Sequence, residues 1–179
     1  MGGSIWVWMT ATVLLLGASA GCHGAAERTA KIVWRGMAEF EAARANNAMD
    51  ASVRRPGKAG DIPHDAIFLH PRNPQRATLD FPPIRVTPVE GTRLFFVGYA
   101  GIADGFKWDD AEHRPDGVRF YVVVNGVDAA AVELKASRWV PMAAEVATGK
   151  PAGEEATVTI QLATDPGPAG NTSYDWAMF

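Results

Sequence analysis

The chain has 179 residues, of which 47% are hydrophobic and 21% are charged, as is typical of one globular domain that can bury a sizeable core. Its formal net charge is −3 and no long basic run occurs, so neither a nucleic acid nor another polyanion is expected as a partner. A single cysteine excludes an intramolecular disulfide and every metal site built from several cysteines.

The N-terminal segment has the pattern of an export signal. No charged side chain precedes Glu27, and residues 5–20, IWVWMTATVLLLGASA, form an apolar run that is shorter than the roughly 20 residues of a membrane span. The small residues of ASAGC before the lone Cys22 resemble a bacterial lipoprotein box, whose thiol is lipidated. We therefore expect a signal peptide over residues 1–22 and a lipid anchor that holds the exported protein to the membrane of the cell envelope. Cleavage after Ala20 and an uncleaved anchor are the alternatives.

A tether with a short helix and a loop is expected over residues 23–64. Good helix formers dominate residues 25–48, and four apolar residues share one side at helical spacing. A strand around residues 31–34 followed by one turn of helix is the alternative. Residues 50–65 are polar and rich in glycine and proline, which predicts a loop. The four apolar residues are Ile32, Val33, Met37 and Phe40.

The pattern then changes to short β-prone runs over residues 65–179. Val118, Phe120, Val122 and Val124 alternate with outward residues, and so do Val158, Ile160 and Leu162. Turn residues separate the runs, and a last strand is expected from Tyr174. This spacing predicts an all-β fold, an antiparallel β-sandwich. The runs cover residues 66–70, 77–81, 92–100, 117–126, 132–142 and 155–164.

Motifs of enzymes are not found. The sequence has no nucleophile elbow, phosphate-binding loop, dinucleotide-binding fingerprint or zinc-protease motif. Its histidines are scattered and predict neither a zinc site nor a catalytic triad. They are His23, His64, His70 and His113.

An acidic loop over residues 101–117 is the first candidate site. Carboxylate oxygens on a loop are suitable ligands for calcium, and we expect Asp104, Asp109 and Asp116 to be the ligands if calcium binds, although the spacing is not that of an EF-hand. Two of the loop's carboxylates could instead act as the acid and base of a glycoside hydrolase, but the sequence does not give their separation.

Aromatic residues near loops and strand ends are the second candidate. Aromatic faces pack against the C–H faces of sugar rings while neighbouring acids bond the hydroxyls, which predicts a mixed lining for a small ligand. For Trp139 and Trp176 a place in the core is the favoured interpretation. The expected ligand contacts are Trp108, Asp109, Asp110, Asp116, Tyr174 and Asp175.

The run LFFVGYAGIADG, then DGVRFYVVVNG and TVTIQLATDPGPAGNTSYDWAMF, resembles galactose-binding-like jelly-roll domains, and most closely the carbohydrate-binding modules of the glycoside hydrolase family 98 type. The resemblance covers residues 65–179. It implies a jelly-roll sandwich that binds glycans or partner proteins and has no catalytic residues. In such domains the strand that matches Asp175 and Trp176 usually continues, whereas this sequence ends at Phe179. A shortened closing strand, from a truncated reading frame or a missing edge, is therefore expected.

The sequence thus predicts a non-catalytic envelope lipoprotein that binds a glycan or surface polymer. The alternative is an envelope scaffold that binds a protein and no small molecule.

Overall fold

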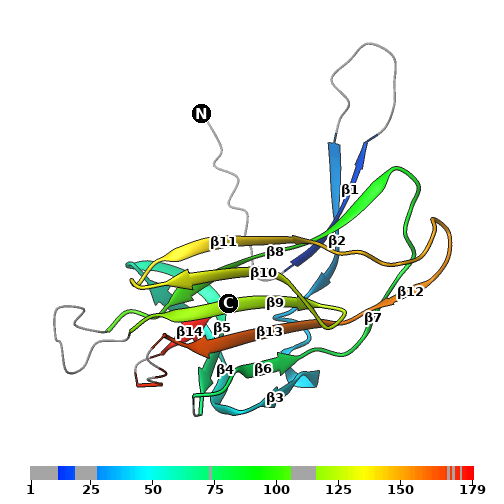
Figure 1. The fold of residues 1–179 in the computed structure, drawn as a ribbon. Coiled ribbons are helices and arrows are strands. Elements are labelled where there is room, and N and C mark those ends of the chain that lie inside the picture. The colour runs from blue at the N-terminus through cyan, green and yellow to red at the C-terminus, as the bar shows by residue number, and fades with distance from the viewer. Residues whose placement is uncertain are drawn as a thin grey trace, which may run out of the picture.

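The computed structural model describes residues 12–18, 28–72, 74–105, 116–168, 170, 172–173 and 175–179. In these residues the chain forms antiparallel strands and one short 3₁₀ helix, η1 (Phe40–Ala42), arranged as a β-sandwich (Figure 1). No helix in the described ranges is long and apolar enough to cross a membrane. The prediction of an antiparallel β-sandwich is confirmed.

The first layer is a seven-stranded sheet in which β8 is the central strand. One edge of β8 pairs with β11, and the other pairs with β14 near its end and with β1 near its start. Strand β14 also pairs with β5, so these two residues join the halves of the sheet. The strands are β2 (Arg28–Arg35), β1 (Thr12–Ala18), β8 (Thr92–Ile102), β14 (Ala177–Met178), β5 (Ile62–Pro71), β4 (Ala48–Ala59) and β11 (Trp139–Glu145).

The second layer is a five-stranded sheet that lies against the first. Strand β13 is its centre and pairs with β9 on one side and β6 on the other. In order, the strands are β10 (Val127–Leu134), β9 (Val118–Val124), β13 (Ile160–Pro166), β6 (Ala77–Asp80) and β3 (Arg44–Asn46). A separate two-stranded sheet contains β12 (Ala156–Val158) and β7 (Ile84–Val86).

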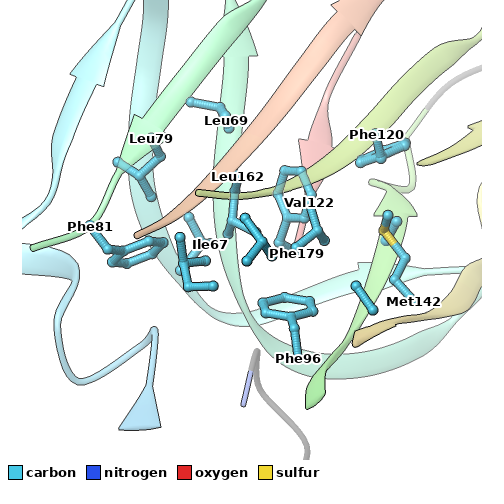
Figure 2. Close-up of a cluster of buried hydrophobic side chains, with 14 of the residues drawn as sticks. Ile67, Leu69, Leu79, Phe81, Phe96, Phe120, Val122, Met142, Leu162 and Phe179 are labelled. Atoms are coloured by element: carbon cyan, nitrogen blue, oxygen red, sulfur yellow. The ribbon is translucent and has the colours of Figure 1, made fainter. Parts of the chain in front are cut away.

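The hydrophobic core fills the space between the two sheets. On β9 the residues predicted to face inward, from Val118 to Val124 at every second position, are buried, as Ile160 and Leu162 are on β13. Phe179 lies among them, and its ring meets the Phe120 ring edge-on with the centroids 5.4 Å apart (Figure 2). Burial of these inner faces is the main stabilising contribution to the fold.

The helical segment predicted over residues 25–48 is wrong. Residues 31–34 lie in β2 and are followed by the single turn η1, as the alternative interpretation expected. Alanine-rich composition favours a helix, but Ile32, Val33 and Trp34 suit a strand, and backbone pairing of β2 with β1 prevails over intrinsic propensity.

The loop predicted over residues 50–65 is also wrong, because these residues form the hairpin of β4 and β5. Only Gly60 and Asp61 turn, with φ of 59° and 61°. Pro56 and Gly57 are tolerated because β4 is an edge strand whose register shifts at this point. Gly57 is required for packing, since a Cβ there would lie 2.6 Å from Met178 Sδ.

Replacing Phe120 by alanine should lower the free energy of unfolding by about 3–5 kcal/mol, because the fully buried ring leaves a cavity between the sheets. Chemical denaturation followed by circular dichroism measures this loss. Val127→Ala serves as the control, since Val127 is 67% exposed and should change the free energy of unfolding by less than about 0.5 kcal/mol. Equal effects of the two substitutions would contradict the placement of the core.

Candidate functional site

Two aspartates face inward at one end of the sandwich. Asp116 comes two residues before Val118, and strand periodicity therefore continues the buried row of β9 to its side chain. Asp175 comes two residues before Ala177, which is buried in the core on β14. Because β9 and β14 belong to opposite sheets, the two inward rows bring the two carboxylates to the same region.

The Asp175 carboxylate is buried although its oxygens accept no hydrogen bond. Its side chain is 0% exposed, and neither oxygen has a hydrogen-bond partner. Burial first, and the negative charge of Asp116 second, raise the pKa of the Asp175 carboxyl to about 8. A carboxyl of this kind needs either a proton or a cation to be stable at neutral pH.

Gly167, directly after β13, packs closely against the start of β9. A Cβ on Gly167 would overlap Asp116 Oδ1 and would lie 2.5 Å from both Asp116 Cγ and the carbonyl oxygen of Gly117. Only glycine lets the backbone approach so closely. The side-chain oxygen of Asp116 and the backbone oxygen of Gly117 therefore lie next to one another at the start of β9.

Asp104 has a different role at the same end of the molecule. Its two carboxylate oxygens accept hydrogen bonds from the backbone N–H groups of Gly60, at 2.7 Å, and Asp61, at 2.9 Å. Its own N–H donates to the carbonyl of Lys58 at 2.8 Å. Asp104 thus fastens the β4–β5 turn to the end of β8.

An aromatic cluster lies on the outer face of the seven-stranded sheet, and we call His64, Tyr99 and Trp139 the aromatic face. The rings of His64 on β5 and Tyr99 on β8 are nearly parallel, with an interplanar angle of 12° and centroids 5.6 Å apart. Trp139 on β11 meets His64 at 82° and 5.2 Å. All three side chains are half-buried, so part of each is open to solvent.

Two contacts fix the Trp139 ring. Its six-membered part lies over Gly101, where a Cβ would be only 2.6 Å from Trp139 Cε3. The indole Nε1–H donates to the carbonyl of Ile62 at 2.8 Å. A ring held in this way presents a surface of fixed orientation.

Trp176 lies beside the aromatic face. Trp139 and Trp176 both pack against a small buried cluster on the outer side of the sheet, formed by Ala59, Ala66, Phe68 and Met178. Gly105 is in contact with Trp176, since a Cβ there would be 3.4 Å from Cζ3 of the tryptophan. Both tryptophans are half-buried, so each combines a packing role with exposed ring surface.

Among the described residues, the outer face of the five-stranded sheet carries no comparable aromatic cluster. The half-buried Tyr121 is covered by the guanidinium of Arg76, which lies 3.8 Å from the ring centroid. Arg76 also forms ion pairs with Asp128, at 3.0 Å, and Asp165, at 3.2 Å. Arg76, held by these two ion pairs, therefore covers the Tyr121 ring face that a ligand would contact.

The structure brings together some of the predicted site residues. Asp116 and Asp175 share one region, whereas the oxygens of Asp104 are bonded to the β4–β5 turn. Within the described ranges no three His, Cys, Asp or Glu side chains gather as a metal-binding group, and the predicted calcium ligands stay a prediction. The predicted residues that lie outside the described ranges are Cys22, Trp108, Asp109, Asp110 and Tyr174.

His64 and Tyr99 were not predicted as site residues. Tyr99 occupies an outward position of β8, two residues after Val97 and four after Phe95, so the alternating pattern placed it on the outer face. His64 was assigned to a loop because the β4–β5 hairpin was not recognised. The available signal was the large outward side chains of Phe95, Val97 and Tyr99 on a strand whose other side is buried.

A hollow of about 640 Å³ opens beside the start of β8. Val33 of β2 and Val89 of the β7–β8 connection line it and are 40% and 53% exposed. Arg93 and Glu145, which are paired across β8 and β11, also line it. The hollow is therefore a mixed apolar and charged surface.

Comparison with known proteins gives a distant structural likeness. A solved structure of the CBM51-2 and INT domains from Clostridium perfringens ZmpB is similar to this chain, with 16% sequence identity and a TM-score of 0.43. The likeness covers 75% of this chain and 29% of that chain, so this chain spans less than a third of the other's length. No protein-family model and no curated protein matches the sequence.

Asp104→Ala should lower the free energy of unfolding by about 1–2 kcal/mol, because two backbone N–H groups of the β4–β5 turn lose a charged acceptor. Urea denaturation measures the change. Asp104→Asn retains one acceptor oxygen and should lose about half as much. An alanine variant as stable as the wild type would show that the carboxylate does not hold the turn.

Proposed function

We propose that this protein is a non-catalytic glycan-binding protein and that the aromatic face is its contact surface. The observation that supports this proposal most strongly is the arrangement of His64, Tyr99 and Trp139, which are half-buried and fixed by neighbouring strands. A sugar ring packs its C–H face on an aromatic ring, and a ring held in advance loses little entropy on binding.

Polar groups beside the rings supply the hydrogen bonds that a sugar needs. The Tyr99 hydroxyl and the His64 imidazole can each donate or accept a hydrogen bond. Aromatic surface together with a few oriented polar groups is the usual composition of a small-ligand site. Specificity would come from these polar groups and affinity from the rings.

The predicted contacts of the acidic loop extend the same surface in this proposal. Ala103 packs with Trp139 and Trp176 against the outer cluster, and Gly105 contacts Trp176, so the chain leaves β8 beside the aromatic face. We include Trp108, Asp109, Asp110 and Tyr174 as further contacts in this proposal. The sequence-based prediction that Asp175 contacts the ligand is wrong for this surface, because Asp175 is 0% exposed and lies on the inner side of the sheet.

A jelly-roll topology of the galactose-binding-like type and a lipid anchor at Cys22 complete the proposal. The support for the anchor is the apolar run before Cys22 and the small residues of ASAGC. Residues Thr12–Ala18 pair as β1 with β8 and β2 in the full chain. Removal of residues 1–21 would therefore expose the backbone of Thr92–Val97 on β8.

An envelope scaffold that binds a protein is the second candidate. The hollow beside the start of β8 favours it, because exposed Val33 and Val89 combine with charged side chains as at protein interfaces. A scaffold should retain a specific envelope protein from membrane extracts through this hollow, and variants of the aromatic face should leave that retention unchanged.

Binding of the full chain to a glycan array, followed by affinity electrophoresis with the glycans that bind, tests the main proposal. Trp139→Ala should weaken binding at least tenfold, or about 1.4 kcal/mol, since the most firmly fixed ring is lost. Trp139→Phe keeps a ring over Gly101 and should weaken binding less. Val127→Ala changes an exposed residue of β10, in the other sheet, and is the control.

Two results would contradict the glycan proposal: binding that is equal in wild type and Trp139→Ala, or a wild-type chain that retains no glycan.

Mass spectrometry of the protein produced in a bacterial host tests the anchor. The expected mature chain begins at Cys22 and carries a diacylglyceryl group on its sulfur. Cys22→Ser should remove the lipid and release the protein from the membrane fraction, because a serine hydroxyl does not form the thioether. A wild-type chain that keeps residues 1–21 and no lipid would refute this part of the proposal and leave glycan binding untouched.

A further inference from the structure

One edge of β8 pairs with two strands that come from opposite ends of the chain. Met178 of β14 lies opposite Gly101, and Thr12 of β1 lies opposite Val97, so β14 and β1 follow one another along this edge. Both run antiparallel to β8. Among the described strands, only β1 pairs with this edge over Thr92–Val97.

This edge borders the hydrophobic core. Leu94 and Phe96 are 6% and 1% exposed and belong to the core between the sheets. Residues opposite one another in an antiparallel pair lie on the same face, so a strand at this edge extends the core with the residues opposite Leu94 and Phe96. In the full chain these positions are Leu15 and Val13. The edge therefore requires a strand with apolar residues at alternate positions.

Strand β2 offers a second backbone edge to whatever occupies the place of β1. Among the described strands, β2 pairs with β1 alone. A packing contact nevertheless ties β2 to the sandwich, because the buried Trp34 ring meets the Phe81 ring edge-on with the centroids 5.0 Å apart. Loss of β1 would thus leave a gap one strand wide between the edges of β8 and β2.

We propose that the Thr92–Val97 edge of β8 binds an extended segment of a partner protein, as a new strand, when β1 is absent. The inference rests on the proposed cleavage before Cys22, which removes all of β1 and keeps β2. An unpaired strand edge is a template for pairing with another chain. In such strand addition, backbone hydrogen bonds supply affinity and alternate side chains supply specificity.

The chemistry of β1 defines the segment that fits. Its seven residues, TVLLLGA, carry no charge and no proline. A fitting partner segment is extended, runs antiparallel to β8 and places apolar residues opposite Leu94 and Phe96. In the precursor, residues 12–18 keep the edge closed, so the partner binds only after the signal peptide has been removed.

A fluorescent peptide with the sequence of residues 12–18, flanked by lysines for solubility, tests the edge. The mature lipoprotein purified from host membranes should bind it at least ten times more tightly than the uncleaved full chain, in which β1 occupies the edge. Cell-free synthesis without membranes supplies the uncleaved chain. Fluorescence anisotropy in the same detergent measures both affinities. The bound peptide should also slow hydrogen exchange at the amides of Thr92–Val97.

Two controls separate strand pairing from general apolar adhesion. A peptide that is N-methylated at every second residue keeps its side chains but loses backbone donors, and it should bind at least tenfold more weakly. In the uncleaved chain, Leu14→Pro together with Leu15→Pro removes donors toward both neighbouring strands and should open the edge. Leu14→Ala with Leu15→Ala retains those donors and should leave it closed.

Equal binding of the two peptides would overturn the proposal, and so would equal binding to the mature and uncleaved chains, because the peptide would then bind elsewhere. A mature chain and a proline variant that bind no peptide would also overturn it; if both are dimers, a second copy occupies the edge. Retention of residues 1–21 in the host, seen by mass, would refute the cleavage alone, and peptide binding by the proline variant would then decide whether the edge accepts a strand.

Discussion

The register of β14 determines how the two halves of the seven-stranded sheet meet. Ala177 pairs with Leu69 and with Ile102, and the backbone of Phe179 exchanges two hydrogen bonds with Ile67. Successive side chains therefore alternate, so that Ala177 and Phe179 enter the core while Met178 enters the outer cluster. A shift by one residue would reverse every one of these positions.

The same alternation explains both candidate sites. Because of this alternation, Asp175 lies on the inner side of the sheet, where Asp116 at the start of β9 is close to it. Trp176 lies on the outer side, near Trp139. A buried acid and a half-exposed tryptophan are thus adjacent in sequence and lie on opposite faces of the sheet. The apolar contacts of Phe179 maintain this register, so packing in the core positions groups that do not themselves belong to the core.

Sequence reasoning predicted the features that depend on the two-residue periodicity of a β-strand. The inward residues of β9 and β13 were predicted correctly, since alternation is strict in strands with one buried face. The β4–β5 hairpin was missed because glycine and proline were interpreted as loop formers, whereas Gly57 is needed to pack against Met178. The aromatic face was missed for a related reason: His64, Tyr99 and Trp139 come from three strands, and only the pairing of those strands unites them. The alternation of Val118 and Phe120, extended by two residues, predicts the side on which Asp116 lies. The position of Asp175 beside it could not be predicted, because it depends on the register of β14.

The contact between Gly101 and Trp139 links two positions that are far apart in the chain. A methyl group at Gly101 would be 2.6 Å from the tryptophan ring, and without the ring the glycine would leave a bare stretch of backbone in the middle of the sheet. Selection should therefore act on the pair and not on either position alone. During divergence, lineages that lose the tryptophan are free to acquire a side chain at the glycine, and those that keep it are not. The pair would then serve as a marker by which relatives that retain the aromatic face are distinguished from those that have lost it.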